Sequence, residues 1–171
     1  MNHLITYLHC GEHLKNSLRI EIEEVVHVVE SIEWEDEFKF VQSDSIMFHQ
    51  TAYNKRFQIE FEQLGWESQP KLSENPRLIG DFEKNLVFVE IQFGNSATLY
   101  RDFYKFQYGQ TNGLTSLNVL IVPCNPAKFF PTRPSSVFNM AEYKLAIRYF
   151  TILPISVPTM IIGLVPEQTR K

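Results

Sequence analysis

The amino-acid sequence predicts an α/β protein in which a central mixed β-sheet begins with a β-hairpin and carries helices on both faces. Segments with apolar residues at the helical period alternate with short apolar runs rich in β-branched and aromatic residues. The turn-forming residues Lys84 and Asn85 separate two such runs, as in a hairpin. The apolar run 117–123 is typical of a strand covered on both faces. The length of 171 residues fits a single domain over residues 1–171.

The order of the elements follows from the periodicity and the end signals. Apolar residues recur at the helical period in four segments, residues 16–31, 50–64, 97–108 and 139–150. Strands are expected at residues 4–10, 77–83, 86–93, 117–123 and 159–165. We expect Asn16 to cap the first helix, Gly65 to end the second, and Asn95 with Ser96 to cap the third. Strands that alternate with helices after a hairpin give a mixed sheet with helices on both faces.

Two polar residues interrupt the apolar strand expected at 86–93. Glu90 and Gln92 are two positions apart, so their side chains point to the same face of the strand. An acid buried on a strand face costs several kcal/mol unless a partner compensates it. The pair therefore indicates either a solvated strand face or a buried face with a partner, such as a bound divalent metal.

The hairpin brings a second acid to this face. A two-residue turn at 84–85 pairs Asp81 with Phe88 and makes Asp81 a diagonal neighbour of Glu90, about 7–8 Å away at the backbone. Two carboxylates at that distance can lean toward one hard cation, with the backbone carbonyl of Ile91 beside them. The pattern leaves two interpretations open, a metal site or a solvated strand next to a turn aspartate.

Composition limits the class of protein. Apolar residues make up 44% of the chain and charged residues 21%, which is typical of a globular domain. No apolar run approaches the ~18–20 residues of a membrane span, and the N-terminus lacks a secretory signal. We therefore expect a cytoplasmic protein with no membrane partner, in which Cys10 and Cys124 are reduced thiols. The sequence has no motif of acyl hydrolases, nucleoside triphosphatases or dinucleotide-binding proteins.

Charge is distributed unevenly along the chain. Residues 1–100 carry 8 Lys and Arg against 17 Asp and Glu, a net charge of −9, whereas residues 101–171 carry 8 against 3, a net charge of +5. A basic C-terminal part suggests a positive face for a polyanion such as a nucleic acid. Ordinary solvated faces give the same counts, so the charge is consistent with nucleic-acid binding and does not require it.

The hairpin also carries a motif. Asp81, followed after eight residues by Glu90-Ile91-Gln92, resembles the active-site motif of the PD-(D/E)XK restriction-nuclease superfamily, whose last residue is usually Lys and in some branches Gln. The chain is similar to the BglII-like type II restriction endonucleases, a branch grouped with BstYI and BamHI. The similarity runs through ITYLHCGEHLKNSLRIEIEE, the Trp66 segment, DFEKNLVFVEIQFGN, LIVPCNPAKFFPTRPSS and PTMIIGLVPE.

This resemblance implies a restriction-endonuclease-like core and a Mg²⁺ ion held by Asp81, Glu90 and the Ile91 carbonyl. Gln92 would orient water or a phosphate oxygen through its amide. Since Gln carries no charge, the metal would supply nearly all the positive charge at the cut phosphate. The resemblance also implies a homodimer that cuts both strands of double-stranded DNA at a short palindrome, with GATC as its centre.

One further position comes from the same resemblance. Gln69 stands where the BglII-like enzymes carry an additional active-site Asn shortly after a Trp, here Trp66. Gln keeps the amide and lengthens the side chain by one methylene, so we expect a catalytic contribution from this position. The chain ends soon after the strand at 159–165, where BglII-like enzymes continue with DNA contacts, and we expect a smaller footprint on DNA.

Sequence readout is expected from the loop after the catalytic strand and from a proline-rich loop. The candidate DNA-binding residues are Asn95, Ser96, Thr98, Lys105, Lys128, Arg133, Ser135 and Ser136. Asn matches the edge of adenine, Arg that of guanine, and Ser either a base or a phosphate. The local pattern of Asn95 favours a helix cap, and Arg133 also fits a phosphate contact or plain solvation. Lys105 is expected on the exposed helix face with Arg101 and Asp102, where it contacts phosphate or only solvent.

Three functions remain open at this point. The first is a Mg²⁺-dependent type II restriction endonuclease, a sequence-specific DNA hydrolase. The second is a structure-specific repair nuclease of the same superfamily, which would cut branched or mismatched DNA. The third is a non-catalytic DNA-binding module. Because Asp81, Glu90 and Gln92 are all present, the sequence favours a nuclease over a decayed site.

Overall fold

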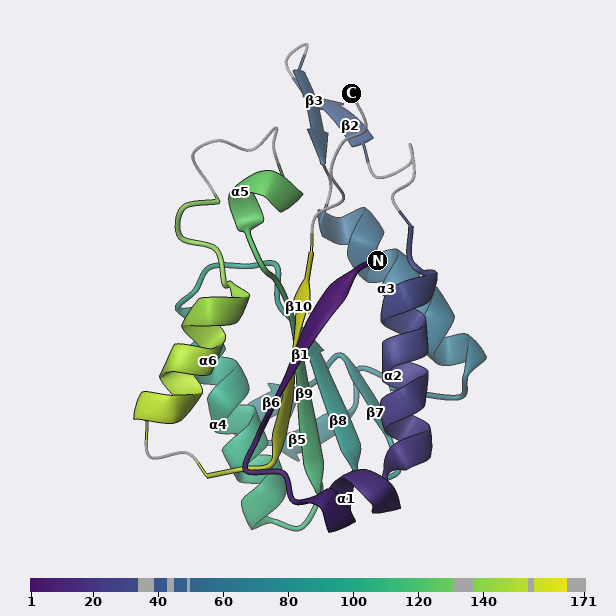
Figure 1. Cartoon of the computed structure of the whole chain (residues 1–171), viewed down its shortest axis with the longest axis vertical. Helices are drawn as coiled ribbons and strands as arrows, with labels where there is room; N and C mark the ends of the chain where they lie inside the picture. Colours follow the sequence, from purple (N-terminus) through teal and green to yellow (C-terminus); the bar gives the residue numbers. More distant parts are fainter. Residues whose placement is uncertain (34–38, 43–44, 49, 131–136, 154–155, 166–171) are drawn as a thin grey trace.

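The structure, a computed structural model, describes residues 1–33, 39–42, 45–48, 50–130, 137–153 and 156–165. Its centre is a six-stranded sheet (Figure 1). From one edge to the other, the strands are β1 (His3–Leu8), β10 (Thr159–Leu164), β9 (Leu117–Pro123), β8 (Val87–Ile91), β7 (Phe82–Lys84) and β4 (Glu67–Ser68). The three central strands β8, β9 and β10 are parallel, and the outer strands are antiparallel to their neighbours. The expected mixed sheet with a hairpin is confirmed.

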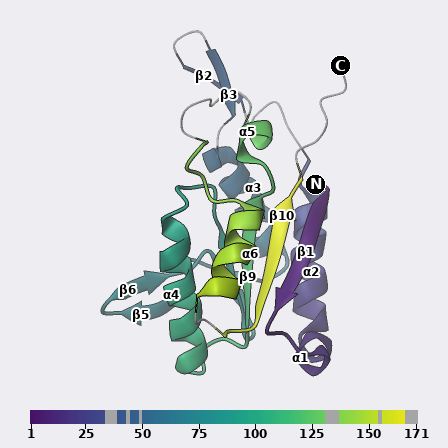
Figure 2. The same ribbon diagram turned by 60° about the vertical axis from the view of Figure 1, so that its left-hand side comes forward.

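Helices pack on both faces of this sheet, as expected. They are α1 (Glu12–Ser17), α2 (Arg19–Ser31), α3 (Gln50–Gln63), α4 (Thr98–Thr111), α5 (Pro126–Phe129) and α6 (Tyr143–Ile152). Helices α2 and α3 cover one face, and α4 and α6 cover the other (Figures 1 and 2). Within the described residues, no helix combines the length and apolarity needed to cross a membrane.

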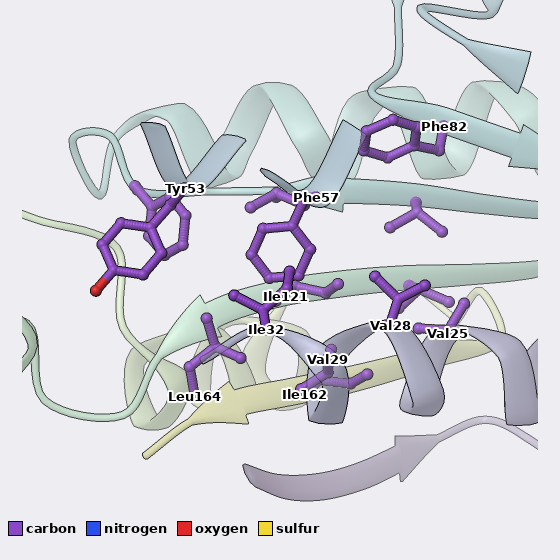
Figure 3. Packing of buried hydrophobic residues seen from close by; sticks show 14 of the residues in the cluster. Val25, Val28, Val29, Ile32, Tyr53, Phe57, Phe82, Ile121, Ile162 and Leu164 are labelled. Carbon is purple, nitrogen blue, oxygen red and sulfur yellow. The ribbon is translucent and has the colours of Figure 1, made fainter. Parts of the chain in front are cut away.

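Each face has its own hydrophobic core. Val28 and Phe57 pack with Ile121 and Ile162 of the sheet on the α2–α3 side (Figure 3). On the other side, Phe103 of α4 meets Phe150 of α6 with ring centroids 4.2 Å apart. Successive side chains of β8 point alternately into the two cores. Its odd-numbered residues belong to the α2–α3 core, so Phe88 and Glu90 face α4.

Two helix starts differ from the prediction. The helix expected over 16–31 is two helices, because the chain bends at Leu18, whose φ and ψ are −110° and 24°. Asn16 lies inside α1 and caps neither helix, so that expectation is wrong. Helix α6 begins at Tyr143, four residues later than expected. Gly65 follows α3 with a φ of +79°, the left-handed conformation expected of a glycine after a helix.

The hairpin forms with its turn one residue later than predicted. Lys84 pairs with Val87, so the turn consists of Asn85 and Leu86, and Asn85 has the positive φ of 43° that such turns need. The shift moves each partner by two positions and therefore keeps the same side chains on the same face. The pairing ends at Phe82 and Val89, and the N–H of Asp81 donates to the Val89 carbonyl at 3.3 Å, so Asp81 lies where the chain leaves β8.

The first hairpin strand is not continuous, in contrast to the expectation. It is split into β6 (Arg77–Ile79) and β7, and β6 pairs with β5 (Lys71–Glu74) in a separate two-stranded ribbon. A second ribbon consists of β2 (Lys39–Gln42) and β3 (Ser45–Phe48). The split leaves Gly80 and Asp81 outside the strands at the edge of β8, which frees the Asp81 side chain for another role.

Candidate active site

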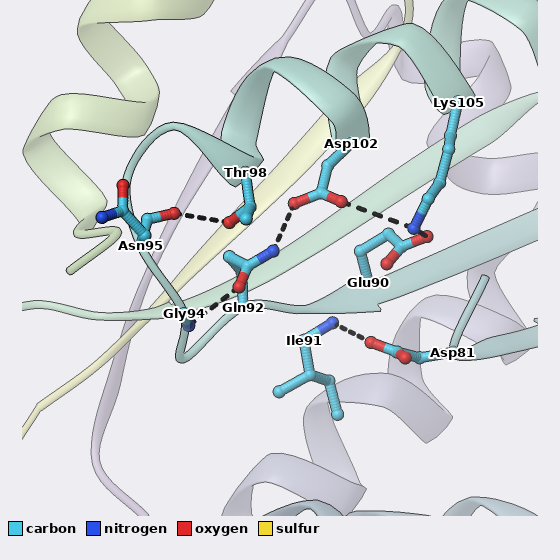
Figure 4. A network of polar contacts seen from close by, with 9 residues as sticks. All are labelled: Asp81, Glu90, Ile91, Gln92, Gly94, Asn95, Thr98, Asp102 and Lys105. Atoms are coloured by element: carbon cyan, nitrogen blue, oxygen red, sulfur yellow. Dashed lines mark hydrogen bonds and ion pairs between the residues drawn. The ribbon is translucent and has the colours of Figure 1, made fainter. Parts of the chain in front are cut away.

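Asp81 reaches the site because the chain leaves the sheet at this point. Gly80 lies so close to the Phe88 ring that a Cβ would be 2.2 Å from it, so the position requires glycine. The Asp81 carbonyl accepts a hydrogen bond from the backbone N–H of Gln69 at 2.9 Å. The Asp81 carboxylate accepts one from the N–H of Ile91 at 2.7 Å (Figure 4). The carboxylate therefore takes the place of a backbone acceptor beside β8.

Glu90 meets α4 on the same side of the sheet. Its side chain is buried, and its Oε1 accepts a hydrogen bond from Nζ of Lys105 at 2.6 Å (Figure 4). The same ammonium group lies 3.5 Å from Oδ1 of Asp102. Lys105 and Asp102 are only 2% and 1% exposed, so the expectation that both lie on an exposed helix face is wrong.

The charges of this cluster do not balance. The carboxylates of Asp81, Glu90 and Asp102 share the buried ammonium group of Lys105, and the exposed Arg101 adds a weaker positive influence on Asp81 and Asp102. Burial raises the pKa of the Glu90 carboxyl well above its ordinary value, and the neighbouring Asp81 and Asp102 raise it further. Burial also raises the pKa of Asp81 and Asp102, although hydrogen bonds from Ile91 and Gln92 respectively oppose the effect. Such a cluster favours an additional cation or bound protons.

Gln92 is held at both ends of its side-chain amide. Its Nε2 donates to Oδ2 of Asp102 at 2.8 Å, and its Oε1 accepts from the N–H of Gly94 at 2.8 Å (Figure 4). A Cβ on Gly94 would lie 2.6 Å from that oxygen, so glycine permits the close turn. Gln92 therefore holds one oxygen of the Asp102 carboxylate, and the other oxygen faces Lys105. One N–H of its amide remains for water or a phosphate oxygen.

Two carboxylates and one carbonyl are the candidate metal ligands. The N–H and C=O of one strand residue point to the same edge, so the Ile91 carbonyl faces the side on which its N–H meets Asp81. Among the described residues, no group of three or more His, Cys, Asp or Glu is arranged to hold a metal ion. Asp81, Glu90 and the Ile91 carbonyl instead form an oxygen-only set, which suits a Mg²⁺ ion that keeps several waters.

The loop after β8 has a structural role in starting α4. The Asn95 Oδ1 accepts a hydrogen bond from the N–H of Ala97 at 2.8 Å, and its carbonyl accepts from the N–H and hydroxyl of Thr98. The N–H of Ser96 donates to the carbonyl of Asn139 at 2.6 Å. The N-cap residue of α4 is Ala97, which makes no side-chain capping bond, so the expected capping by Asn95 and Ser96 is wrong, and Asn95 instead stabilises the turn that leads into α4. The Asn95 side-chain oxygen is occupied by the Ala97 N–H. Because the side chain is exposed, its NH₂ group can still donate to a ligand.

Of the remaining DNA-binding candidates, the structure describes Lys128, which lies beyond the carboxyl end of β9. Lys128 is exposed on α5, which follows β9. The rings of Phe93 and Phe129 stack with centroids 5.8 Å apart, so α5 and the loop after β8 are neighbours. The other three candidates, Arg133, Ser135 and Ser136, lie outside the described residues.

Sequence reasoning missed Asp102 as a site residue and misplaced Lys105. A signal was present, because Asp102 stands three residues after Leu99 and four before Phe106, on the apolar stripe of α4. An acid on a buried stripe requires a partner. The hydrogen-bond partner comes from another segment of the chain, because the Gln92 amide after β8 donates to Asp102 at 2.8 Å.

Comparisons with known proteins bear on the whole chain. A family model described as Restriction endonuclease BglII/BglIII matches residues 3–164. No curated protein matches the chain. The crystal structure of restriction endonuclease BglII complexed with a DNA 16-mer matches with a TM-score of 0.78 at 17% identity, over 100% of this chain and 79% of that chain. The structure of free BglII matches with a TM-score of 0.70 at 19% identity, over 100% and 82%. The solved structures share the fold, and the chain belongs to the restriction endonuclease BglII/BglIII family, whose members cleave DNA.

Proposed function

We propose that the protein is a Mg²⁺-dependent type II restriction endonuclease that cuts both strands of double-stranded DNA at a short palindromic site. The observation that carries this proposal is the meeting of Asp81 and Glu90 beside the Ile91 carbonyl on the α4 side of β8. Since the substrate is DNA and both cysteines are free thiols, we place the enzyme in the reducing cytoplasm.

The residues of the cluster fit a divalent metal ion. The buried carboxylates of Glu90 and Asp102 and the half-buried one of Asp81 face the ammonium group of Lys105, so a dication would restore the balance of charge. Asp81, Glu90 and the Ile91 carbonyl would hold the ion. When bound, it would neutralise charge at the cleaved phosphate and lower the pKa of the attacking water. Asp81 is oriented for this task by the Ile91 N–H, and Glu90 by its position in a buried strand.

The neighbouring amides position these acids. Gln92 holds Asp102 through its amide nitrogen and has one N–H left to orient a water or a phosphate oxygen. Gln69 has an exposed side chain, and its backbone N–H fixes the Asp81 carbonyl at 2.9 Å. We propose that Gln69 contributes its amide to the same site, next to Asp81.

DNA would lie across the carboxyl ends of the parallel strands. Asn95, Ser96 and Thr98 at the start of α4 and Lys128 on α5 belong to this end of the sheet. The exposed amide of Asn95 can donate to a base, and Lys128 can contact phosphate. We include Lys105 among the residues near the cleaved phosphate, because it is part of the acid cluster.

Cutting both strands of a palindrome requires two copies of the site, which a two-fold homodimer supplies. Exposed apolar side chains on α4 and α6 support such an interface. Tyr100 and Tyr104 on α4 are each 51% exposed, and Ile152 on α6 is 69% exposed. Tyr149 of α6 stacks on Tyr100 with ring centroids 5.1 Å apart, so the two helices present one continuous surface.

The direct test is a digest of plasmid DNA of known sequence with the full chain and Mg²⁺. We expect discrete fragments whose sequenced ends share one palindrome. Glu90→Ala is expected to stop cleavage while binding to the same DNA in Ca²⁺ persists.

Other results would contradict the proposal. A smear without a common end sequence would contradict site specificity. Cleavage only at branched or mismatched DNA would identify a repair nuclease. No cleavage of any of these substrates in Mg²⁺ or Mn²⁺ would rule out the enzymatic function.

A further inference from the structure

We propose that the ammonium group of Lys105 occupies the place of the metal ion while no metal is bound. In that state it pairs with Glu90, and when a divalent ion binds Glu90 it pairs with Asp102 instead. This inference rests on the proposed function, since it assumes that Asp81 and Glu90 bind metal. It starts from an unexpected placement. The position that usually carries Lys in the motif is Gln92, and the positive charge instead comes from α4, a different element.

The geometry provides both partners of this exchange. Nζ of Lys105 lies 2.6 Å from Glu90 Oε1 and 3.5 Å from Asp102 Oδ1. Asp102 is one turn earlier on the same helix and its other oxygen is already held by Gln92 at 2.8 Å. The oxygen nearer Lys105 is therefore oriented for it. A small rotation of the lysine side chain completes the exchange, and neither α4 nor β8 has to move (Figure 4).

Burial makes the exchange obligatory. Glu90 and Lys105 are 3% and 2% exposed, so water screens their charges poorly. A dication at Glu90 and an ammonium group at hydrogen-bond distance from the same carboxylate repel each other. Lys105 and the metal therefore compete for Glu90. Without either cation, the buried Glu90 and Asp102 and the half-buried Asp81 would have, among the described residues, only the exposed Arg101 as a positive charge nearby.

Competition predicts an unusual result for the Lys105→Met variant. Without metal, the variant is less stable than the wild type at neutral pH, because its buried acids lack a cation. Its affinity for a divalent ion is higher, about tenfold, because no ammonium group has to be displaced. A tenfold gain in affinity corresponds to about 1.4 kcal/mol of additional metal-dependent stabilisation.

A purely structural ion pair predicts a different result. If Lys105 only stabilised the fold, Lys105→Met would lower stability equally with and without metal, and the affinity for metal would stay the same or fall. Metal affinity and metal-dependent stability therefore separate the two roles without any measurement of DNA cleavage. The conservative Lys105→Arg variant keeps the positive charge, so its stability without metal and its affinity for metal should stay close to those of the wild type.

The experiment is calorimetric titration of the full chain with Mn²⁺, together with thermal unfolding in EDTA and in saturating Mn²⁺. Lys144→Met is the matched control, since the same substitution removes an exposed positive charge from α6, away from the acid cluster. Should Lys105→Met fail to fold without metal, the double variant Lys105→Met with Asp102→Asn removes one charge of each sign. It still lacks the competing ammonium group and should bind Mn²⁺ more tightly than the wild type.

The outcomes distinguish this inference from the proposed function. Tighter Mn²⁺ binding by Lys105→Met or by the double variant, with no change for Lys144→Met, supports the exchange. Unchanged or weaker binding by both variants overturns it and leaves the endonuclease proposal intact. If the wild type binds no Mn²⁺ and Glu90→Gln changes neither binding nor cleavage, the proposed metal site itself is wrong.

Discussion

Two lysine–glutamate pairs lie on opposite faces of the sheet, and they differ in how completely their charges are matched. In the first, Lys84 donates to both Glu24 carboxylate oxygens at 2.8 Å and to the Leu64 carbonyl at 2.7 Å, while Trp66 Nε1 donates to Glu24 at 2.9 Å. In the second, Lys105 serves Glu90 with Asp102 close by and Asp81 on the other side.

The comparison separates a structural ion pair from a functional one. Glu24 and Lys84 are one acid and one base, each about a quarter to a fifth exposed, and they join α2 to the hairpin and to the end of α3. The Glu90 cluster is buried, has more acids than bases and is assembled from β8, α4 and the Gly80–Asp81 break. A folded chain tolerates such an imbalance where a ligand completes it.

The largest effect is expected from removing the acid at the centre of the unbalanced cluster. Glu90→Gln should lower the rate of DNA cleavage about 10³-fold or more, equivalent to ~4 kcal/mol of transition-state stabilisation, because it removes a proposed metal ligand. Single-turnover cleavage in Mg²⁺ measures this. Glu24→Gln, the same change in the balanced pair, should leave the rate unchanged. Equal losses in both variants would refute the distinction.

The next effect is a dependence of stability on pH in the absence of metal. The folded-state pKa of Glu90 is raised well above 4.5, and that of Asp81 and Asp102 above 3.8. The folded protein therefore binds more protons than the unfolded chain in this range. Its free energy of unfolding is highest below these ordinary values and falls as pH rises through the raised pKa of Glu90.

Urea denaturation in EDTA at a series of pH values from about 4.5 upward measures this dependence. Glu90→Gln should flatten the decrease, because the substituted amide does not titrate. Saturating Mn²⁺ should flatten it as well, since a bound cation stabilises the ionised carboxylates. A free energy of unfolding that rises with pH in EDTA, with the same slope in Glu90→Gln, would show that the cluster is not the source.

Structural features that depend on a single segment of the chain can be predicted from the sequence. Alternation within a single segment predicts the hairpin, which forms although its turn lies one residue later. The same alternation puts Asp81 and Glu90 on one face, and in the structure the charge of Asp81 is near enough to raise the pKa of Glu90. The strand at Leu117–Pro123 was predicted with its observed bounds, because a run covered on both faces is continuous in the sequence.

The errors arise where the outcome depends on two elements. Asp102 and Lys105 were assigned to the exposed face of a helix, since a charged residue usually lies there. Their burial follows from the packing of α4 on β8, which brings Glu90 to Lys105, and helix periodicity alone does not show it. Asn16 was assigned as a cap on a residue preference, whereas the bend at Leu18 decides where α2 begins.

A smaller effect is expected from removing Lys84 from its ion pair with Glu24. Lys84→Met should lower the free energy of unfolding by about 1–3 kcal/mol, because Glu24 loses its charged partner while Trp66 still donates to it. The same loss is expected in EDTA and in Mn²⁺, and cleavage should be unaffected. Lys71→Met, in the exposed Lys71–Glu74 pair, is the control and should cost about 0.5 kcal/mol or less. A metal-dependent loss in Lys84→Met would contradict its structural role.

The smallest effect concerns Asn95, where a hydrogen bond in the turn before α4 and a proposed DNA contact involve one side chain. Asn95→Ala should lower the free energy of unfolding by about 1 kcal/mol, because the N–H of Ala97 loses its acceptor. Asn95→Asp keeps the accepting oxygen and favours the helix N-terminus, so stability should be retained. The aspartate, however, has no N–H to offer a base and repels phosphate. If Asn95 faces DNA, Asn95→Asp should fold like the wild type and still bind the site more weakly. If Asn95 only accepts the hydrogen bond from Ala97, Asn95→Asp should bind and cut DNA as the wild type does. Other residues at this end of the sheet must then recognise the DNA sequence.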